Sequence, residues 1–137
     1  NIIDASIERL RDAEIIPDDK LTATQLAHLE LARAIAARAH GGEPVRGVYA
    51  SLIPPASDRT RTAGMYGQNT QEIYIDLSQL DWGHKTVDTV IHELAHHTSG
   101  DEDLTEAHAT HMTRLASYVV SLTHEGRFDE LMKDVTW

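Results

Sequence analysis

The segment Thr89-V-I-H-E-L-A-H-H-T-S-G-D-E-D-L-T-E-A-H-A-T-H-Met112 decides how the rest of this sequence is interpreted. It holds five of the nine histidines of the chain, and two of them frame the motif His92-Glu93-Leu94-Ala95-His96. In a helix, residues four apart lie one turn above each other on the same face. The motif therefore predicts two imidazoles placed to grip one metal ion, with Glu93 beside them as a general base toward a bound water.

The opposite face of the same helix is apolar. Its residues follow the i, i+3, i+4, i+7 and i+11 spacing of a helix that packs on a core, and they are Val87, Val90, Ile91, Leu94 and Thr98. A solvated surface helix would also be two-faced, with its histidines simply in water. The apolar Leu94 and Ala95 between the two histidines favour a metal site over that simpler interpretation.

A third protein ligand is required, because zinc takes four tetrahedral positions and a catalytic site leaves one of them for water. Gly100 is expected to end the helix and a second helix to begin near Asp103. His96 and Glu106 then lie equally far from the bend, so Glu106 is the predicted third ligand. Glu106 could instead close a capping box that starts at Asp103. Asp103, which follows a glycine turn, and His108, whose helical stripe favours a packed core residue, are the alternatives.

The remaining polar side chains near this segment have weaker assignments. His97 lies about 100° from His96 around the helix, which favours a place at the rim of the site. The side chains that could donate a hydrogen bond to a developing oxyanion are His84, Tyr66 and Tyr74. An ordinary structural role is expected for each of the three, and the sequence suggests no partner for His28.

The first half of the chain predicts helices followed by strands. A short helix is expected over residues 4–14. The capping box Thr22-Ala-Thr-Gln25 opens a second helix that runs to about residue 39. Three strand-like segments follow, and the turn at residues 68–71 joins the last two as a hairpin. These segments are residues 45–53, 62–67 and 72–77.

The second half returns to a helical pattern. Thr86 is the expected N-cap of the helix that carries the motif and ends at Ser99. A long helix over residues 103–124 and a short one that ends near residue 133 are expected after it. Helices, then strands, then helices predict an α+β domain with a small, three-stranded, antiparallel sheet.

Length and composition narrow the class of protein. A chain of 137 residues fits one domain with a core of its own, and the absence of cysteine leaves His, Asp and Glu as metal ligands. A formal net charge of −10 disfavours binding to nucleic acid. Neither a membrane span nor a signal peptide is evident, so a cytoplasmic location is expected. The start at Asn1 suggests a fragment of a longer protein.

HELAH followed by an acidic residue on the next helix resembles the gluzincin class of zinc metallopeptidases, and the compact element order resembles the minimal gluzincins. HELAHHTSG with an acidic segment after it also resembles HExxH domains encoded by phages and bacteria. The resemblance is specific over about residues 72–112. It implies a zincin-like fold, zinc held by His92, His96 and a downstream glutamate, here Glu106, and Glu93 as general base and acid. The spacing to Glu106 is shorter than in that class.

The first hypothesis is therefore a zinc metalloendopeptidase that acts on peptide or protein substrates. An extended peptide would lie along the sheet as an added strand, with the strand at residues 72–76 as the candidate edge. The second hypothesis is a non-catalytic zinc module within a larger protein, and the third is a metal-free helical interaction domain. Glu93 favours the first, because a purely structural site has no use for a base at that position.

Overall fold

The computed structural model describes residues 13–39, 42–55, 62–101, 103 and 105–137. Its strands are β1 (Glu14–Ile16), β2 (Gly47–Leu52), β3 (Gly64–Gly67) and β4 (Glu72–Asp76). Its α-helices are α2 (Ala23–Arg38), α3 (Gly83–Ser99), α4 (Glu106–His124) and α5 (Asp129–Met132). Short 3₁₀ turns lie at Asp18–Lys20 and Leu77–Gln79. Most of the helix expected over residues 4–14 lies outside the described residues, and its last position, Glu14, begins strand β1.

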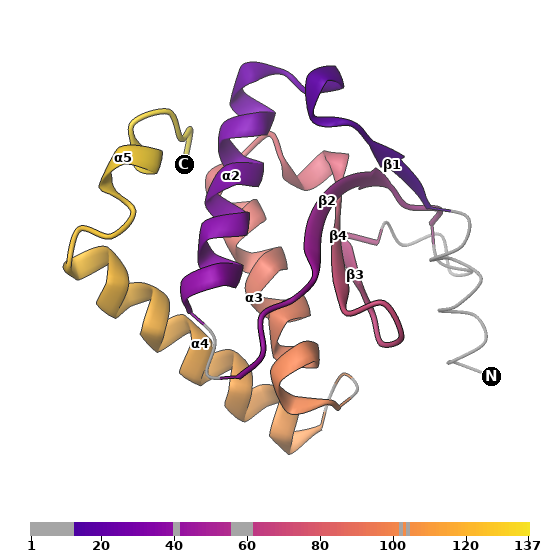
Figure 1. Ribbon diagram of the computed structural model, residues 1–137, viewed down its shortest axis with the longest axis vertical. Helices are drawn as coiled ribbons and strands as arrows, with labels where there is room; N and C mark the ends of the chain where they lie inside the picture. Colours follow the sequence, from indigo (N-terminus) through magenta and orange to yellow (C-terminus); the bar gives the residue numbers. More distant parts are fainter. Residues whose placement is uncertain (1–12, 40–41, 56–61, 102, 104) are drawn as a thin grey trace.

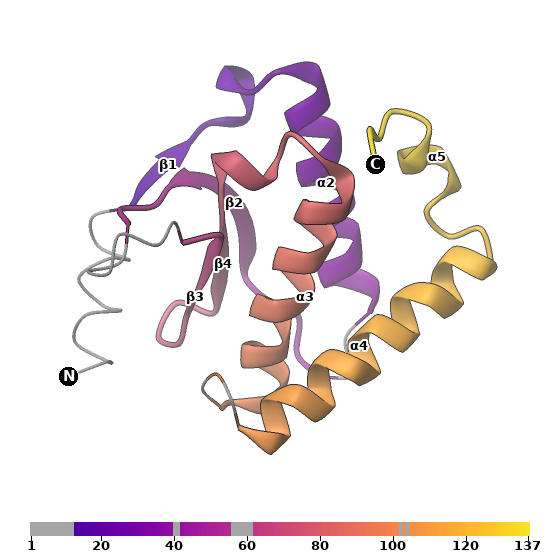
Figure 2. The same cartoon turned by 180° about the vertical axis from the view of Figure 1, so that it is seen from behind.

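The fold is α+β, as predicted, with α2 and α3 on one face of a sheet (Figure 1). Seen from behind, α4 runs diagonally past the C-terminal end of α3, on the side of α3 away from the sheet (Figure 2). α3 therefore lies between the sheet and α4. Among the described residues, no helix combines the length and the apolar character needed to cross a bilayer.

The sheet differs from the one expected. It has four strands in the order β1-β2-β4-β3, because β1 adds a strand that the sequence pattern did not indicate. The β3–β4 hairpin is antiparallel as predicted, but β2 pairs with β4 in parallel, with Val48 opposite Ile73. The chain passes from β2 to the outer edge before it forms the hairpin, so β4 returns beside β2 in the same direction. β4 is consequently an inner strand, and the prediction that it forms the edge was wrong.

The alternation predicted for β4 is confirmed. Ile73 and Ile75 are fully buried in the main core, against α2 and α3. Tyr74 points to the other face, where it packs with Met65 and Ile53. Fully burying a side chain such as Ile73 contributes roughly 1.5–3 kcal/mol, so the alternation sets which face of the sheet the helices cover.

The helix boundaries are in part those predicted. The capping box of α2 is present, with Thr22 Oγ1 3.1 Å from the backbone nitrogen of Gln25 and Gln25 Oε1 2.9 Å from that of Thr22. Gly100 ends α3 in the left-handed conformation, with φ of 70°. Thr86 is not the N-cap of α3, because the helix begins at Gly83 and the Thr86 hydroxyl donates to the carbonyl oxygens of Gln79 and Trp82.

α4 begins later than predicted. Its first residue is Glu106, and its N-cap is Thr105, whose side chain accepts a hydrogen bond from the backbone nitrogen of His108. The capping box at Asp103, which was the alternative to Glu106 as a ligand, is therefore not formed. Either residue type can cap a helix, and the choice of Thr105 leaves Asp103 in the connection between α3 and α4.

His28, for which the sequence suggested no partner, joins three parts of the chain. It is buried in α2, its Nδ1–H donates to the carbonyl oxygen of Leu80 at 2.6 Å, and its Nε2 accepts from the backbone nitrogen of Thr136 at 2.9 Å. This places a neutral imidazole between α2, the segment before α3 and the C-terminal segment.

Substitution His28→Leu is expected to lower the free energy of unfolding by about 1–3 kcal/mol, because the buried carbonyl of Leu80 loses its donor. Denaturant unfolding followed by circular dichroism measures the change. His124→Leu, at an exposed position of α4, is the control and should stay within about 0.5 kcal/mol of the unmodified protein. Equal stability of the two variants would contradict the role given to His28.

Candidate metal centre

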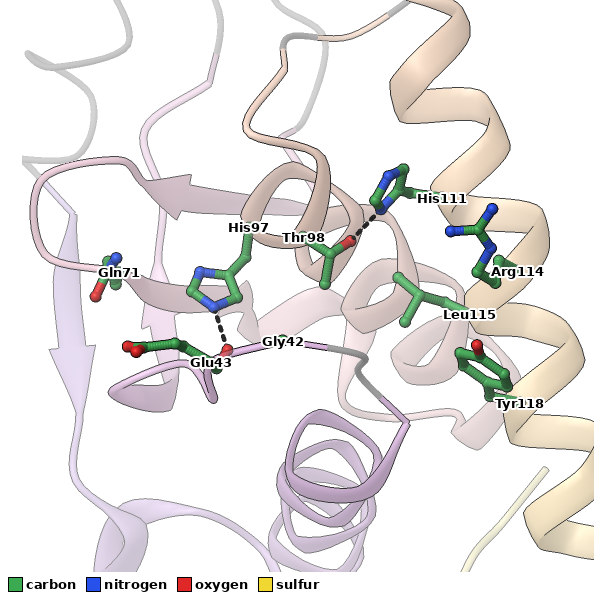
Figure 3. Close-up of a pocket in the computed structure, with 9 residues that line it drawn as sticks. All are labelled: Gly42, Glu43, Gln71, His97, Thr98, His111, Arg114, Leu115 and Tyr118. Carbon is green, nitrogen blue, oxygen red and sulfur yellow. Dashed lines mark hydrogen bonds between the residues drawn. The ribbon is translucent and has the colours of Figure 1, made fainter.

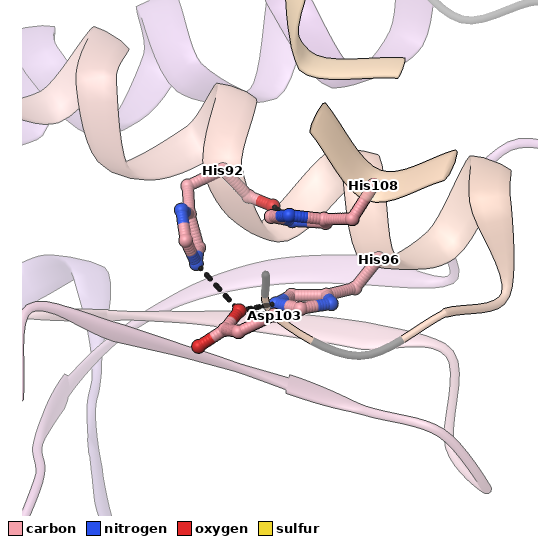
Figure 4. Close-up of side chains that lie close together, drawn as sticks. All are labelled: His92, His96, Asp103 and His108. Carbon is pink, nitrogen blue, oxygen red and sulfur yellow. Dashed lines mark hydrogen bonds and ion pairs between the residues drawn. The ribbon is translucent and has the colours of Figure 1, made fainter. Parts of the chain in front are cut away.

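Four side chains converge where α3, the connection after it and the start of α4 meet (Figure 4). They are His92 and His96 of α3, Asp103 of the connection and His108 of α4, and we call them the metal group. Each offers one ligand atom, and these atoms all lie within 4.8 Å of one another. Imidazole nitrogens and a carboxylate oxygen are ligands that zinc and other transition metals accept. The metal group could therefore hold a metal ion.

Asp103 links the two histidines of the motif. Its Oδ1 lies 3.0 Å from His92 Nε2 and 2.6 Å from His96 Nε2. Partial burial acts to raise the pKa of Asp103, but the charges of His92 and His96 outweigh it and hold that pKa below its usual value. The carboxyl group is thus kept ionised, which is the form that binds metals.

His96 is oriented by a hydrogen bond at the ring nitrogen that does not face Asp103. Its Nδ1–H donates to the backbone carbonyl of Asp101 at 2.7 Å, which leaves Nε2 directed at Asp103. A bond from the second ring nitrogen to a carbonyl is the usual support of a metal-binding histidine, because it fixes both tautomer and ring orientation. The carbonyl that supplies it follows directly after the Gly100 turn, so the end of α3 is part of the site.

The ring planes restrict which histidines can share an ion, because an imidazole nitrogen binds an ion in the plane of its ring. The planes of His92 and His96 cross at 76°, so one ion can lie in both. His96 and His108 are stacked, with centroids 4.1 Å apart and planes only 21° from parallel. No point ~2.0–2.1 Å from a nitrogen of each ring, the Zn–N distance, lies in both planes. In this arrangement His96 and His108 cannot bind the same ion.

His108 is held by other interactions. Its Nε2–H donates to the backbone carbonyl of His92 at 3.1 Å, and the side chain is almost fully buried. Burial lowers the pKa of His108, so the neutral imidazole is favoured. The sequence-based expectation of a packed, hydrogen-bonded histidine at this position is in accord with these contacts.

Glu93 lies beside the metal group and is only 6% exposed. Its Oε1 is 3.9 Å from His96 Nε2. Burial raises the pKa of Glu93 to about 8, and the negative charge of Asp103 adds to the effect. A buried carboxyl group whose pKa lies near neutrality is suited to both accepting and returning a proton.

Gly64 of β3 permits this close packing. A Cβ at that position would lie 2.6 Å from Thr89 Cγ2, 3.0 Å from the carbonyl oxygen of Tyr74 and 3.3 Å from Glu93 Cγ. β3 therefore approaches α3 closely at Thr89 and at the Cγ of Glu93.

Glu106, the predicted third ligand, does not belong to the metal group. As the first residue of α4 it is exposed, at the helix terminus where a carboxylate is favoured by the helix dipole. The structure brings Asp103 and His108 to the two motif histidines in its place. Both were sequence alternatives, and the glycine turn before Asp103 was the signal that pointed to it.

The side chains considered as oxyanion donors have other partners. The Tyr66 hydroxyl donates to His97 Nδ1 at 2.6 Å, and His97 Nε2–H donates to the carbonyl oxygen of Glu43. The Tyr74 hydroxyl donates to the carboxylate of Glu72, and His84 Nδ1–H donates to the carbonyl oxygen of Trp137. Each of the three therefore makes a structural hydrogen bond.

His97 faces a pocket of about 470 Å³ that is lined by nine residues from α3, α4, the segment before β2 and the β3–β4 turn (Figure 3). Thr98 and His111 bond to each other across it, and Arg114 and Tyr118 extend its wall along α4. None of the residues that line this pocket belongs to the metal group. The pocket and the candidate metal centre are thus separate features of α3.

No family model matches the chain, and neither the curated proteins nor the solved structures include a significant match to it. The geometry of the metal group and its neighbours is therefore the basis on which a function can be proposed.

Substitution Gly64→Ala should lower the free energy of unfolding by about 1–3 kcal/mol, since the new methyl group overpacks the contact between β3 and α3. Denaturant unfolding measures the loss. Gly42→Ala provides the matched control, because a Cβ there would meet nothing within 4 Å. A Gly64→Ala variant as stable as the control would show that β3 and α3 are not in close contact at Glu93.

Proposed function

We propose that the protein is a zinc-dependent metallopeptidase whose ion is held by His92, His96 and Asp103. The observation that carries the proposal is the position of Asp103 Oδ1, 3.0 Å and 2.6 Å from the Nε2 atoms of the two motif histidines. Two imidazoles and one carboxylate form a ligand set of catalytic zinc, which keeps its fourth position for water. Asp103 takes the role that the sequence suggested for Glu106.

The ligand types favour zinc. Imidazole suits zinc, copper, iron and nickel, whereas sites built mainly from carboxylate and carbonyl oxygen suit magnesium, calcium and manganese. Two histidine nitrogens and one carboxylate oxygen, in a chain without cysteine, match the composition of catalytic zinc sites.

A bound zinc ion would lower the pKa of a coordinated water toward ~7 and polarise a substrate carbonyl. Glu93 would hold the proton taken from that water and pass it to the leaving amine. The side chain of Glu93 is suited to this task because it lies next to His96 and is buried where β3 approaches α3. A positive ion beside Glu93 would also oppose the effect of burial on its pKa.

The neighbouring strand supports a peptide as the proposed substrate. β3 is an edge strand of the sheet, and its first residue, Gly64, packs opposite Glu93. An extended peptide that adds to this edge would pair its backbone with β3 and pass beside Glu93. β3 therefore replaces β4 as the edge on which a peptide substrate is proposed to bind.

A non-catalytic metal module is the second candidate function. The observation that favours it is the inclusion of His108 in the metal group, because four protein ligands close a structural zinc site. The stacking of His108 on His96 opposes it, since the two rings as they lie cannot bind one ion.

Substitution Glu93→Gln should leave about one zinc per chain in place and reduce hydrolysis of a fluorogenic peptide library by at least ~10²-fold, because the proton acceptor is lost. Elemental analysis and initial rates measure the two quantities. A variant that hydrolyses peptides as fast as the unmodified protein would exclude Glu93 as the base. A zinc-loaded, unmodified protein without turnover on any peptide would favour the non-catalytic module.

Substitution Asp103→Asn should weaken zinc binding by more than ~10-fold, because a neutral amide replaces the ionised ligand. Competition with a chromophoric chelator measures the dissociation constant. Glu106→Gln is the matched control and should bind zinc as the unmodified protein does. The reverse outcome, with zinc lost only from the Glu106→Gln variant, would restore the ligand expected from the sequence.

A further inference from the structure

We infer that His108 is a positioning residue of the metal centre, which stays outside the coordination sphere and holds both ligand histidines of α3 in place. The inference rests on the proposed function, because it takes His92, His96 and Asp103 as the ligands. It gives α4 an indirect part in metal binding, because no atom of α4 would touch the ion.

The ring of His108 fixes the orientation of His96. The two rings stack with centroids 4.1 Å apart, so the His108 ring packs on one face of the His96 imidazole. The backbone carbonyl of Asp101 holds the edge of the same ring through Nδ1. Rotation of His96 out of its ligating orientation would break both contacts.

The same side chain also tethers the backbone of the motif. His108 Nε2–H donates to the carbonyl oxygen of His92 at 3.1 Å. A carbonyl oxygen has two lone pairs, so it can accept this bond in addition to the one inside α3. The bond joins α4 to α3 at the first ligand histidine, while the rings of His108 and His92 make a T-shaped contact with centroids 4.8 Å apart.

The start of α4 is itself arranged to present His108. The backbone nitrogen of His108 donates to Thr105 Oγ1 at 3.1 Å, so the N-cap of the helix fixes the third residue of its first turn. The His108 side chain is 1% exposed, and its position is therefore set by packing as well as by hydrogen bonds. Supporting residues of this kind typically change metal affinity 10–100-fold when they are substituted.

Two substitutions separate the roles of the ring and the donor. His108→Gln keeps an N–H that can reach the His92 carbonyl but loses the stacked ring, whereas His108→Phe keeps a ring on His96 and loses the donor. His111→Gln, one turn further along α4 and outside the metal group, is the matched control. Each protein is titrated with Zn²⁺ and, separately, with Co²⁺ as a spectroscopic probe of the ligands.

We expect both His108 variants to bind Zn²⁺ ~10–100-fold more weakly, with His108→Gln the tighter of the two, and His111→Gln to bind normally. The visible bands of bound Co²⁺ should keep the same positions in all four proteins, because the ligand set is unchanged. A shift of these bands in both His108 variants would overturn the inference, since His108 would then be a ligand. Normal Zn²⁺ affinity in both would overturn it as well and leave His108 a simple core residue.

These outcomes are distinct from failure of the proposed function. If the unmodified protein takes up neither ion, the zinc site and the inference are both overturned. If it binds zinc and hydrolyses peptides while the Co²⁺ bands shift in the His108 variants, only the inference is overturned. Circular dichroism of each variant confirms that it is folded, and His108→Gln carries the test alone if His108→Phe does not fold.

Discussion

The packing of α3 between the sheet on one side and α4 on the other is the constraint on which the candidate metal centre depends. Val90 and Leu94, on the core side of the helix, are fully buried. On the other side, the Nε2–H of His108 is bonded to the backbone carbonyl of His92. Because both sides are held, the face between them, which carries His92 and His96, has a defined position relative to Asp103. A helix with only one face packed would leave that position free to vary.

Acidic side chains are concentrated at the candidate metal centre. Glu93 and Asp103 are acidic groups of a chain whose formal net charge is −10, and burial of Glu93 makes its ionised form costly. A divalent ion between His92, His96 and Asp103 would stabilise both carboxylates. The electrostatics of the site and the directions of its ligand atoms therefore agree in favouring a cation.

Local patterns predicted much of this fold and site. The i, i+4 spacing placed His92 and His96 on one helix face, the capping box placed the start of α2 at Thr22, and Gly100 marked the end of α3. Each of these features depends on residues within a few positions of one another. The alternation of Ile73, Tyr74 and Ile75 likewise predicted which face of β4 meets the core.

Features that depend on distant residues were not predictable in the same way. The parallel pairing of β2 with β4 depends on the path of the chain between strands, and the partners of His28 lie 52 and 108 residues away. The candidate third ligand is an intermediate case. Both Asp103 and Thr105 are residues that cap helices, and only the start of α4 at Glu106 shows that Thr105 is the cap and that Asp103 is free to turn toward α3.

A crystal structure of the protein grown with zinc, with anomalous diffraction recorded on both sides of the zinc absorption edge, tests the central claim most directly. The account predicts one zinc peak per chain, ~2.0–2.2 Å from His92 Nε2, His96 Nε2 and an Asp103 carboxylate oxygen, with a water molecule in the fourth position and His108 beyond bonding distance. No zinc at this position, or a zinc ion bound by Glu106 or His108 instead of Asp103, would contradict it.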